Sequence, residues 1–297
     1  MKVITISKKR FKELNKIVLS KNVTNTEAKI LDLNYNGKEK ILKALYYLQG
    51  TIFANKLYTI EMLDSNKDYL PSSFLIPDFL CTVSGEVIGF TLPKFEGSNL
   101  SDILLSTKIE FKEQIYYLKK IGEILNQLQN IRLYTPLDSI YINDLHESNF
   151  LVNLKNRELK VIDLDSCKIG HNKVFPSRYL CKDSILEYSN KYKINNDENF
   201  MGYIKPDSNS EIYCYVMVIL NYLFKDKVNR LDLNEFYEYL NYLEYIGINK
   251  KLVTIFSKIV NNCDNENPYL YLDSIKDEQI CRANKIIYNK IKNKVLK

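Results

Sequence analysis

The chain lacks several features by which a protein of its size is usually assigned to a class. Among its 297 residues there is no tryptophan, and there is no glycine before Gly37. No two of its six cysteines lie a few residues apart, the spacing that zinc sites and redox motifs usually need. We therefore expect free thiols and a reducing compartment, which favours a cytoplasmic location.

Long hydrophobic runs are absent as well. Near the start, a four-residue apolar run is followed by basic residues at 8–12, and it is too short for the core of a signal peptide. The longest uncharged apolar run, residues 212–224, is too short to span a bilayer and predicts a buried helix. We expect a soluble protein with no membrane partner.

The charge balance points to no obvious macromolecular partner. The chain carries 42 basic and 36 acidic residues, a formal charge of +6, and its lysines are scattered. No basic stripe with interleaved aromatic residues is present, so we do not expect a nucleic-acid partner. Hydrophobic residues make up 45% of the chain, which predicts a globular protein of one large domain or two lobes.

The first third of the chain reads as strands with one helix. Asn36-Gly37 and Ser84-Gly85-Glu86 each separate two apolar runs, and Asn-Gly is a strong hairpin signal because both residues accept positive φ. Between the two hairpins, apolar residues recur at helical spacing. The predicted elements are strands 28–33 and 38–45, helix 51–63, and strands 79–83 and 87–92.

The rest of the chain is mainly helical. Apolar stripes and a capping glycine, Gly247, mark the helices, and a short hairpin interrupts them. Residues 166–210 have little periodicity, and loops of that length are usually functional or disordered. The predicted elements are strands 150–153 and 159–162 and helices 111–131, 212–224, 234–246, 250–260, 267–275 and 283–291. This predicts a two-lobed α+β protein, with a small antiparallel-sheet lobe (1–96) and a larger helical lobe (97–297).

Three polar side chains stand around the predicted hairpin at 150–162. Asp144 and Asn149 precede it, and Asp163 follows it. Phosphoryl transfer needs a carboxylate that orients the incoming hydroxyl, oxygen ligands for Mg²⁺, and a cation that holds the phosphates. Asp144 is the candidate base, Asn149 and Asp163 are candidate metal ligands, and Lys43 is the candidate cation, oriented by an acidic partner such as Glu61.

At this point the chain resembles the protein-kinase-like superfamily, over about residues 20–275. NDLHESNF resembles the catalytic loop, VIDLD the strand into D-F-G, and ILKAL the strand of V-A-I-K. TLPKFEGSNLSDIL resembles the hinge, and SEIYCYVMVILNYLF resembles the segment that opens the central buried helix. The resemblance implies a two-lobed kinase fold and ATP and Mg²⁺ as cofactors.

The resemblance also implies roles for single residues. Asp144 would be the catalytic base, and Asn149 and Asp163 would bind Mg²⁺. Lys43 would contact the α- and β-phosphates and pair with Glu61. Backbone groups of Pro93 and Phe95, with Leu92 behind them, would hydrogen-bond adenine.

The chain departs from the family pattern at several positions. No glycine-rich loop is present, so residues 20–27 would have to cover the phosphates. Asn143 replaces the arginine before the catalytic aspartate, D-F-G reads Asp163-Leu164-Asp165, and Glu211 stands where aspartate is usual. His146 resembles the D-L-H-x-x-N form of small-molecule phosphotransferases.

Alternatives remain open at this stage. Asp144, Asn149 and Asp163 are also common turn residues beside a hairpin, and Lys43 and Glu61 are also common on solvated surfaces. Asp165 is a second metal ligand or a turn cap. The leading hypothesis is transfer of phosphate from ATP to Ser or Thr of a protein substrate. The alternatives are phosphorylation of a small-molecule alcohol and a pseudokinase that acts as a scaffold.

Overall fold

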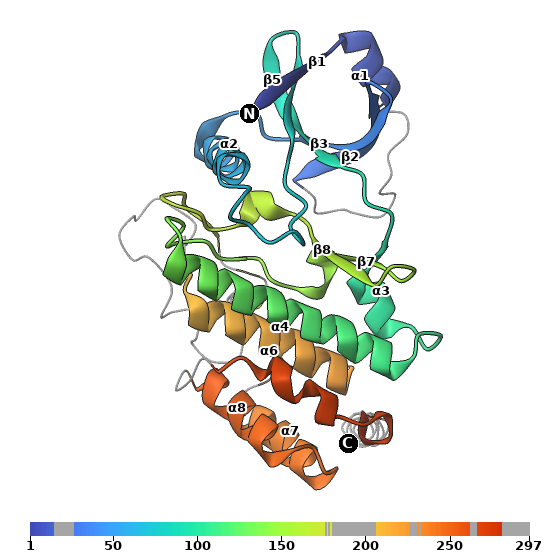
Figure 1. The fold of residues 1–297 in the computed structure, drawn as a ribbon, viewed down its shortest axis with the longest axis vertical. Coiled ribbons are helices and arrows are strands. Elements are labelled where there is room, and N and C mark those ends of the chain that lie inside the picture. The colour runs from blue at the N-terminus through green and yellow to red at the C-terminus, as the bar shows by residue number, and fades with distance from the viewer. Residues whose placement is uncertain are drawn as a thin grey trace, which may run out of the picture.

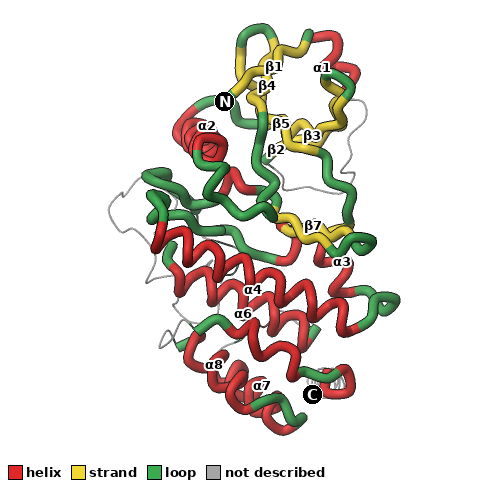
Figure 2. Tube along the Cα trace, in the orientation of Figure 1, coloured by secondary structure: helices red, strands yellow, loops and turns green. Residues whose placement is uncertain are grey.

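The structure is a computed structural model of the chain. It describes residues 1–14, 27–175, 177, 179, 206–225, 228, 231, 233–261 and 266–280. The fold is α+β, with an N-terminal five-stranded sheet followed by a mainly helical region (Figure 1). Figure 2 shows the same two parts, with β1 to β5 at one end and β7 nearer the middle, next to the helices.

The N-terminal sheet has the strand order β1-β4-β5-β3-β2. A short helix, α1, follows β1, and the longer α2 stands between β3 and β4 in the chain. The elements of this region are β1 (Lys2–Ile6), α1 (Lys8–Leu14), β2 (Ala28–Tyr35), β3 (Lys38–Leu45), α2 (Gly50–Ser65), β4 (Phe79–Val83) and β5 (Glu86–Pro93).

Both predicted hairpins are confirmed, and their turns show why. Asn36 and Gly37 have φ values of 51° and 75°, and Ser84 and Gly85 have 55° and 87°. Two consecutive residues at positive φ match the right-handed twist of the strands that they join. β2 therefore pairs antiparallel with β3, and β4 with β5, in registers that the turns determine.

The prediction of a purely antiparallel sheet is wrong. β1 was not predicted as a strand, and it pairs in parallel with β4, with Ile4 opposite Cys81. The sheet is therefore mixed. Ile4 and Ile6 are buried while Val3 and Thr5 are exposed, so the side chains of β1 point alternately into the core and toward solvent.

The helical region also contains a small three-stranded sheet, ordered β6-β7-β8, whose last two strands follow α4 in the chain. Helices α4 and α6 lie side by side beneath it, with α7 and α8 beyond them (Figure 1). The elements are β6 (Ser98–Asn99), α3 (Leu100–Leu105), α4 (Phe111–Tyr134), η1 (Glu147–Asn149), β7 (Phe150–Asn153), β8 (Glu158–Val161), η2 (Leu164–Ser166), α6 (Ser208–Phe224), α7 (Leu233–Tyr245), α8 (Lys250–Val260) and η4 (Pro268–Ser274).

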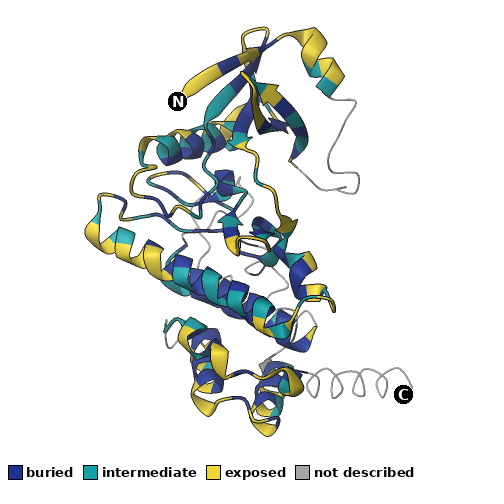
Figure 3. Ribbon diagram, turned by 45° about the vertical axis from the view of Figure 1, so that its right-hand side comes forward, coloured by how far each residue is buried: buried dark blue, intermediate teal, exposed yellow. Residues whose placement is uncertain are grey.

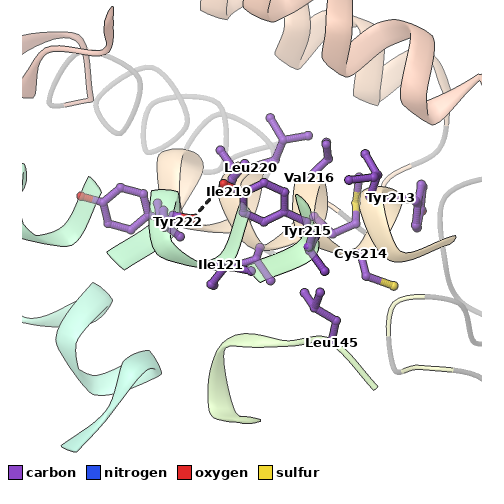
Figure 4. Packing of buried hydrophobic residues seen from close by; sticks show 14 of the residues in the cluster. Ile121, Leu145, Tyr213, Cys214, Tyr215, Val216, Ile219, Leu220 and Tyr222 are labelled. Atoms are coloured by element: carbon purple, nitrogen blue, oxygen red, sulfur yellow. Dashed lines mark hydrogen bonds between the residues drawn. The ribbon is translucent and has the colours of Figure 1, made fainter. Parts of the chain in front are cut away.

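The largest apolar core is centred on α6. Helix α6 is buried on nearly all sides, as the uncharged run at 212–224 predicted, and α4 shows one buried and one exposed face (Figure 3). Figure 4 shows Leu145 in the same packed cluster as Ile121 of α4 and Cys214 of α6. The residue after Asp144 is thus anchored in the core.

Some of the first 96 residues pack into the core of the helical region. Leu63 of α2 and the following Leu70 and Phe74 belong to the large cluster around α6. Leu75 donates its N–H to Val161 of β8 at 3.0 Å, and Val161 donates to Ser73 at 2.8 Å. A boundary at residue 96 stays a prediction, and these contacts join the two parts.

Most of the remaining helices agree with the sequence within a few residues. The segment predicted as helix 267–275 forms the 3₁₀ helix η4, and the helix predicted at 283–291 lies outside the described residues. Much of the loop predicted at 166–210 is also outside them. None of the helices that the structure describes is long and apolar enough to cross a membrane.

Candidate functional site

The β7–β8 hairpin brings Asn149 and Asp163 together. Asn149 immediately precedes β7, and Asp163 follows β8 by two residues. The Asn149 carbonyl accepts the N–H of Ile162 at 2.9 Å, which continues the ladder of the hairpin. Asp163 has a φ of 62°, a left-handed conformation that aspartate tolerates better than most residues. The two candidate metal ligands therefore lie side by side at the open end of the hairpin.

Asn149 also links the hairpin to Asp144. Its amide Nδ2 donates to the Asp144 carbonyl at 2.9 Å. The Asp144 side chain is 31% exposed, and its Oδ2 lies 3.3 Å from Nε2 of the buried His146. Since Nδ1 of His146 accepts the N–H of Ser148, the network assigns the ring proton to Nε2, which donates to Asp144. His146 thus orients the candidate base.

Lys43 reaches this group from the N-terminal sheet. It lies on β3, opposite Phe90 of β5, and its ammonium group forms ion pairs with Asp163 and with Asp165, the latter at 2.7 Å. Burial by itself lowers the pKa of Lys43, but the two carboxylates outweigh it and raise the pKa well above its usual value. Lys43 and Asp163, which are 120 residues apart in the chain, thus meet at one site.

The predicted pair between Lys43 and Glu61 is not formed. Glu61 is exposed on α2, and within the described residues the acidic partners of Lys43 are Asp163 and Asp165. The α2 side chain that faces the site is Lys56, which binds Asp165 at 2.7 Å. Five residues along an α-helix turn by about 140° beyond a full circle, so Lys56 and Glu61 point to different sides.

The burial pattern of α2 explains why Lys56 faces the site. The buried residues of α2 are Lys56, Thr59, Ile60 and Leu63, which is the i, i+3, i+4, i+7 spacing of a core-facing stripe. A lysine at the first position of such a stripe must find a buried anion, because an unpaired charge in that place is too costly. The pattern thus pointed to an acidic partner, although it did not say which one.

Asp165 does not cap the turn, because its side chain forms two ion pairs instead, and its role as a second metal ligand stays a prediction. It lies within η2, its side chain is 1% exposed, and its two oxygens are taken by Lys43 and Lys56. Burial alone would raise the pKa of Asp165, but the two lysines lower it well below its usual range. Asp163 differs from Asp165 in two ways. Its side chain is 34% exposed. Its pKa is raised, because the burial of the rest of the carboxyl, together with the charge of Asp165, outweighs the attraction of Lys43.

A second buried ion pair supports the loop that carries Asp144. At the start of α6, Glu211 accepts the N–H of Ile142 at 2.6 Å and pairs with Arg132 of α4 at 2.8 Å. Arg132 also donates to the Ile140 carbonyl at 2.8 Å and stacks on the Tyr141 ring. Burial raises the pKa of Glu211 to about 7, although Arg132 and the Ile142 N–H oppose it. The glutamate thus keeps a structural contact to the loop.

The predicted adenine-binding segment connects the two sheets. Pro93 ends β5 and is exposed, and Phe95 is half-buried before β6. A Cβ on Gly97 would come within 2.7 Å of the Phe95 ring and 2.8 Å of the Val152 carbonyl oxygen, so this position requires glycine. No contact tests the roles of Pro93 and Phe95, which stay predictions.

Two departures from the family pattern can be placed. Asn143 is buried, and its amide donates to the Phe175 carbonyl at 2.5 Å, so it ties the Asp144 loop to the segment after η2. Of the segment predicted to cover the phosphates, residues 20–26 lie outside the described residues. Glu27 at its end pairs with Lys56 at 2.7 Å.

A cavity of about 370 Å³ lies next to the Asp144 loop. Glu147 of η1, Leu104 of α3, and Tyr222 and Lys225 at the end of α6 contribute to its lining. Glu147 is three residues from Asp144, so their Cα atoms are at most about 11 Å apart. The cavity therefore lies beside the loop that carries the candidate base, and Asp144 itself is not among its lining residues.

The donor set fits Mg²⁺ held jointly with a phosphate. The Asp163 side chain is partly exposed. Because Nδ2 of Asn149 is directed at the Asp144 carbonyl, the amide oxygen of Asn149 is the end that remains to ligate a cation. No cluster of three or more His, Cys, Asp or Glu side chains in the described part of the chain could hold a metal alone. Mg²⁺ commonly takes one or two protein ligands and completes its shell with substrate phosphates and water.

Comparison with known proteins adds no family to this picture. The models of known protein families give no match to the chain, and neither do the sequences of curated proteins.

Proposed function

We propose that the chain has a protein-kinase-like fold and transfers the γ-phosphoryl group of ATP to a hydroxyl group of a protein Ser or Thr. The observation that supports this best is the convergence of four polar groups from distant parts of the sequence. Lys43 pairs with Asp163, Asp163 lies beside Asn149, and Asn149 bonds the Asp144 loop. A cation, two oxygen ligands and a carboxylate base are what this reaction needs.

Each residue has one task in this reaction. Lys43 holds phosphate oxygens by charge. Asp163 and Asn149 hold Mg²⁺, which would neutralise the charge that develops on the transferred group. Asp144, oriented by His146, accepts the proton of the attacking hydroxyl. The protein contributes position and charge, and no covalent intermediate is required.

The acceptor would approach from the cavity beside Glu147. This cavity has a charged group of each sign, Glu147 and Lys225, and apolar walls from Leu104 and Val218. A protein side chain or a small alcohol would both fit these features. His146 favours the small-molecule alternative by resemblance, so the acceptor class has to be measured.

Phosphate transfer from γ-labelled ATP tests the proposal directly. The full chain is incubated with Mg²⁺, labelled ATP and either a mixture of protein substrates or a set of small alcohols. We expect labelled protein, and its loss in Asp144→Asn. Label on a small alcohol alone would assign the acceptor class to metabolites. No transfer, combined with an unchanged melting temperature in Mg-ATP, would refute nucleotide chemistry.

The pseudokinase alternative makes a different prediction. A scaffold that only binds nucleotide would show a higher melting temperature with Mg-ATP but would transfer no phosphate. In that case the wild type and Asp144→Asn would give the same background label. Glu158→Gln is a suitable control for preparation effects, because Glu158 is exposed at the far end of the β7–β8 hairpin. Transfer that this control keeps and Asp144→Asn loses would establish turnover.

A further inference from the structure

The strongest unassigned feature is a line of charged side chains that runs through the site and is buried in its middle. Its members alternate in sign: Glu27, Lys56, Asp165, Lys43 and Asp163. We call these residues the five-charge chain. It starts at the residue before β2, passes through α2 and η2, and ends at a candidate metal ligand.

Asp165 is the centre of the five-charge chain and its most buried member. Its Oδ1 accepts from Lys43 and its Oδ2 from Lys56, each at 2.7 Å, and only 1% of the side chain is exposed. A carboxylate with this little solvent access, and with a lysine bound to each oxygen, is not open to direct contact with a substrate. Its contribution must therefore be made through Lys43 and Lys56.

We propose that Asp165 is the residue that positions Lys43 for phosphate binding, and that Lys56 holds Asp165 in place from α2. This pair takes the part that the resemblance gives to Glu61. The inference rests on the proposed function, since it concerns how Lys43 meets the phosphates.

The geometry around the Lys43 ammonium explains why a second carboxylate is needed. Lys43 lies between Asp163 and Asp165 and donates to both. An ammonium group has three donors, so two are used and one remains for a phosphate oxygen. Without the charge of Asp165, Lys43 would be drawn to Asp163 alone, where it competes with Mg²⁺ for the same carboxylate.

The position of α2 is coupled to the same loop by uncharged contacts. Asn172 donates to Thr59 of α2 at 2.7 Å, and the N–H of His171 donates to the Tyr58 hydroxyl at 3.3 Å. A Cβ on Gly170 would come within 2.7 Å of that hydroxyl. Since these contacts dock α2 without any charge, the ion pair between Lys56 and Asp165 is not needed merely to attach the helix.

The test measures how much the phosphates contribute to nucleotide binding. The full chain is titrated with adenosine and with Mg-ATP. The readout is the dissociation constant of adenosine divided by that of Mg-ATP, which is large when the phosphates contribute to binding. In Asp165→Asn we expect this ratio to fall about tenfold or more, because a charged hydrogen bond to phosphate is lost or misdirected. Adenosine affinity should not change, whereas a general structural loss would weaken both ligands.

Three further variants separate positioning from stability. Asp165→Asn should also lower the melting temperature, because Lys56 keeps only the half-exposed Glu27 as a partner. In Asp165→Asn combined with Lys56→Met that charge is gone, so we expect the melting temperature to recover at least in part while the ratio stays low. Glu61→Gln should keep the wild-type ratio. Asp68→Asn makes the same chemical change at an exposed position after α2 and is the matched control.

The outcomes are distinguishable. A double variant that regains the wild-type ratio would overturn the inference, because Asp165 would then only balance Lys56. A Glu61→Gln variant that behaves like Asp165→Asn would overturn it as well. A wild-type ratio near one would refute the proposed function itself, and with it any part for Lys43 in phosphate binding.

Discussion

Replacing Glu211 by glutamine should change how stability depends on pH. Glu211 is buried at the start of α6, and burial raises its pKa to about 7 from an ordinary value of 4.5. The folded protein therefore holds this proton more tightly than the unfolded chain does. Stability from this group is fully present below pH 4.5, decreases as pH rises, and is lost above pH 7.

The magnitude follows from the two pKa values. Between pH 5 and pH 8, a single carboxyl with these values costs the folded protein about 2.5 kcal/mol. Glutamine has the shape of the neutral carboxyl and does not titrate. At pH 5 the variant should therefore be close in stability to the wild type, within about 1 kcal/mol for altered hydrogen bonds to Arg132 and Ile142. Between pH 5 and pH 8, the unfolding free energy of the variant should rise by about 2.5 kcal/mol relative to that of the wild type.

Urea unfolding of both proteins at pH 5 and pH 8 measures this difference. Arg132 and Asp207 act on the pKa of Glu211 itself, and Tyr141 and Cys167 interact with it as well. The titration of distant groups is common to both proteins and cancels in the comparison when the slopes agree. Glu86→Gln, at an exposed position, is the control. If the glutamine variant instead becomes relatively less stable at pH 8, the attraction of Arg132 outweighs burial and the reasoning is wrong.

Three further predictions concern packing and chemistry. Leu145→Ala should cost about 2 to 5 kcal/mol in urea unfolding, because Leu145 is fully buried, whereas Leu270→Ala at an exposed position should cost less than about 0.5 kcal/mol. Gly89→Ala should cost about 3 kcal/mol, because the added Cβ would overlap the Lys43 carbonyl oxygen; Gly85→Ala, which has open space, should show only the backbone cost of about 1 kcal/mol. Equal losses in the two glycine variants would contradict the steric argument. Asp144→Asn should lower the rate of phosphate transfer by about 100-fold or more with unchanged Mg-ATP affinity, and a parallel loss of affinity would show that Asp144 acts in binding.

Local elements could be predicted because their signals lie within a few residues. The turn at Asn36-Gly37 needs positive φ at two positions, and these two residues accept it wherever the strands go. The buried run in α6 has an apolar residue on every side, and only a central helix can bury all of them. Such features depend on backbone preference and periodicity.

β1 shows the opposite case. Its five residues carry a weak alternating pattern, and the strand forms because β4, more than 70 residues later, offers an edge for parallel pairing. Nothing in residues 2–6 names that partner. A strand of this length is not stable by itself, so its existence is decided by the sheet that it joins.

The candidate site divides in the same way. The convergence of Asp144, Asn149 and Asp163 could be predicted from their spacing around a short hairpin, because a hairpin brings its two ends together whatever surrounds it. The acidic partners of Lys43 could not be predicted in this way. Ion pairs form over about 3 Å, and the rotation of α2 about its own axis decides whether Lys56 or Glu61 faces the site.

The sequence by itself thus determined the α+β class, the hairpins, the buried helix and most of the side chains that make up the candidate site. Only the tertiary structure decided that the sheet is mixed, that Glu61 faces solvent and that Asp165 lies between two lysines. Backbone preferences act between neighbours in the chain, whereas charge pairing and burial act between neighbours in space. The second kind of neighbour exists only once the chain has folded.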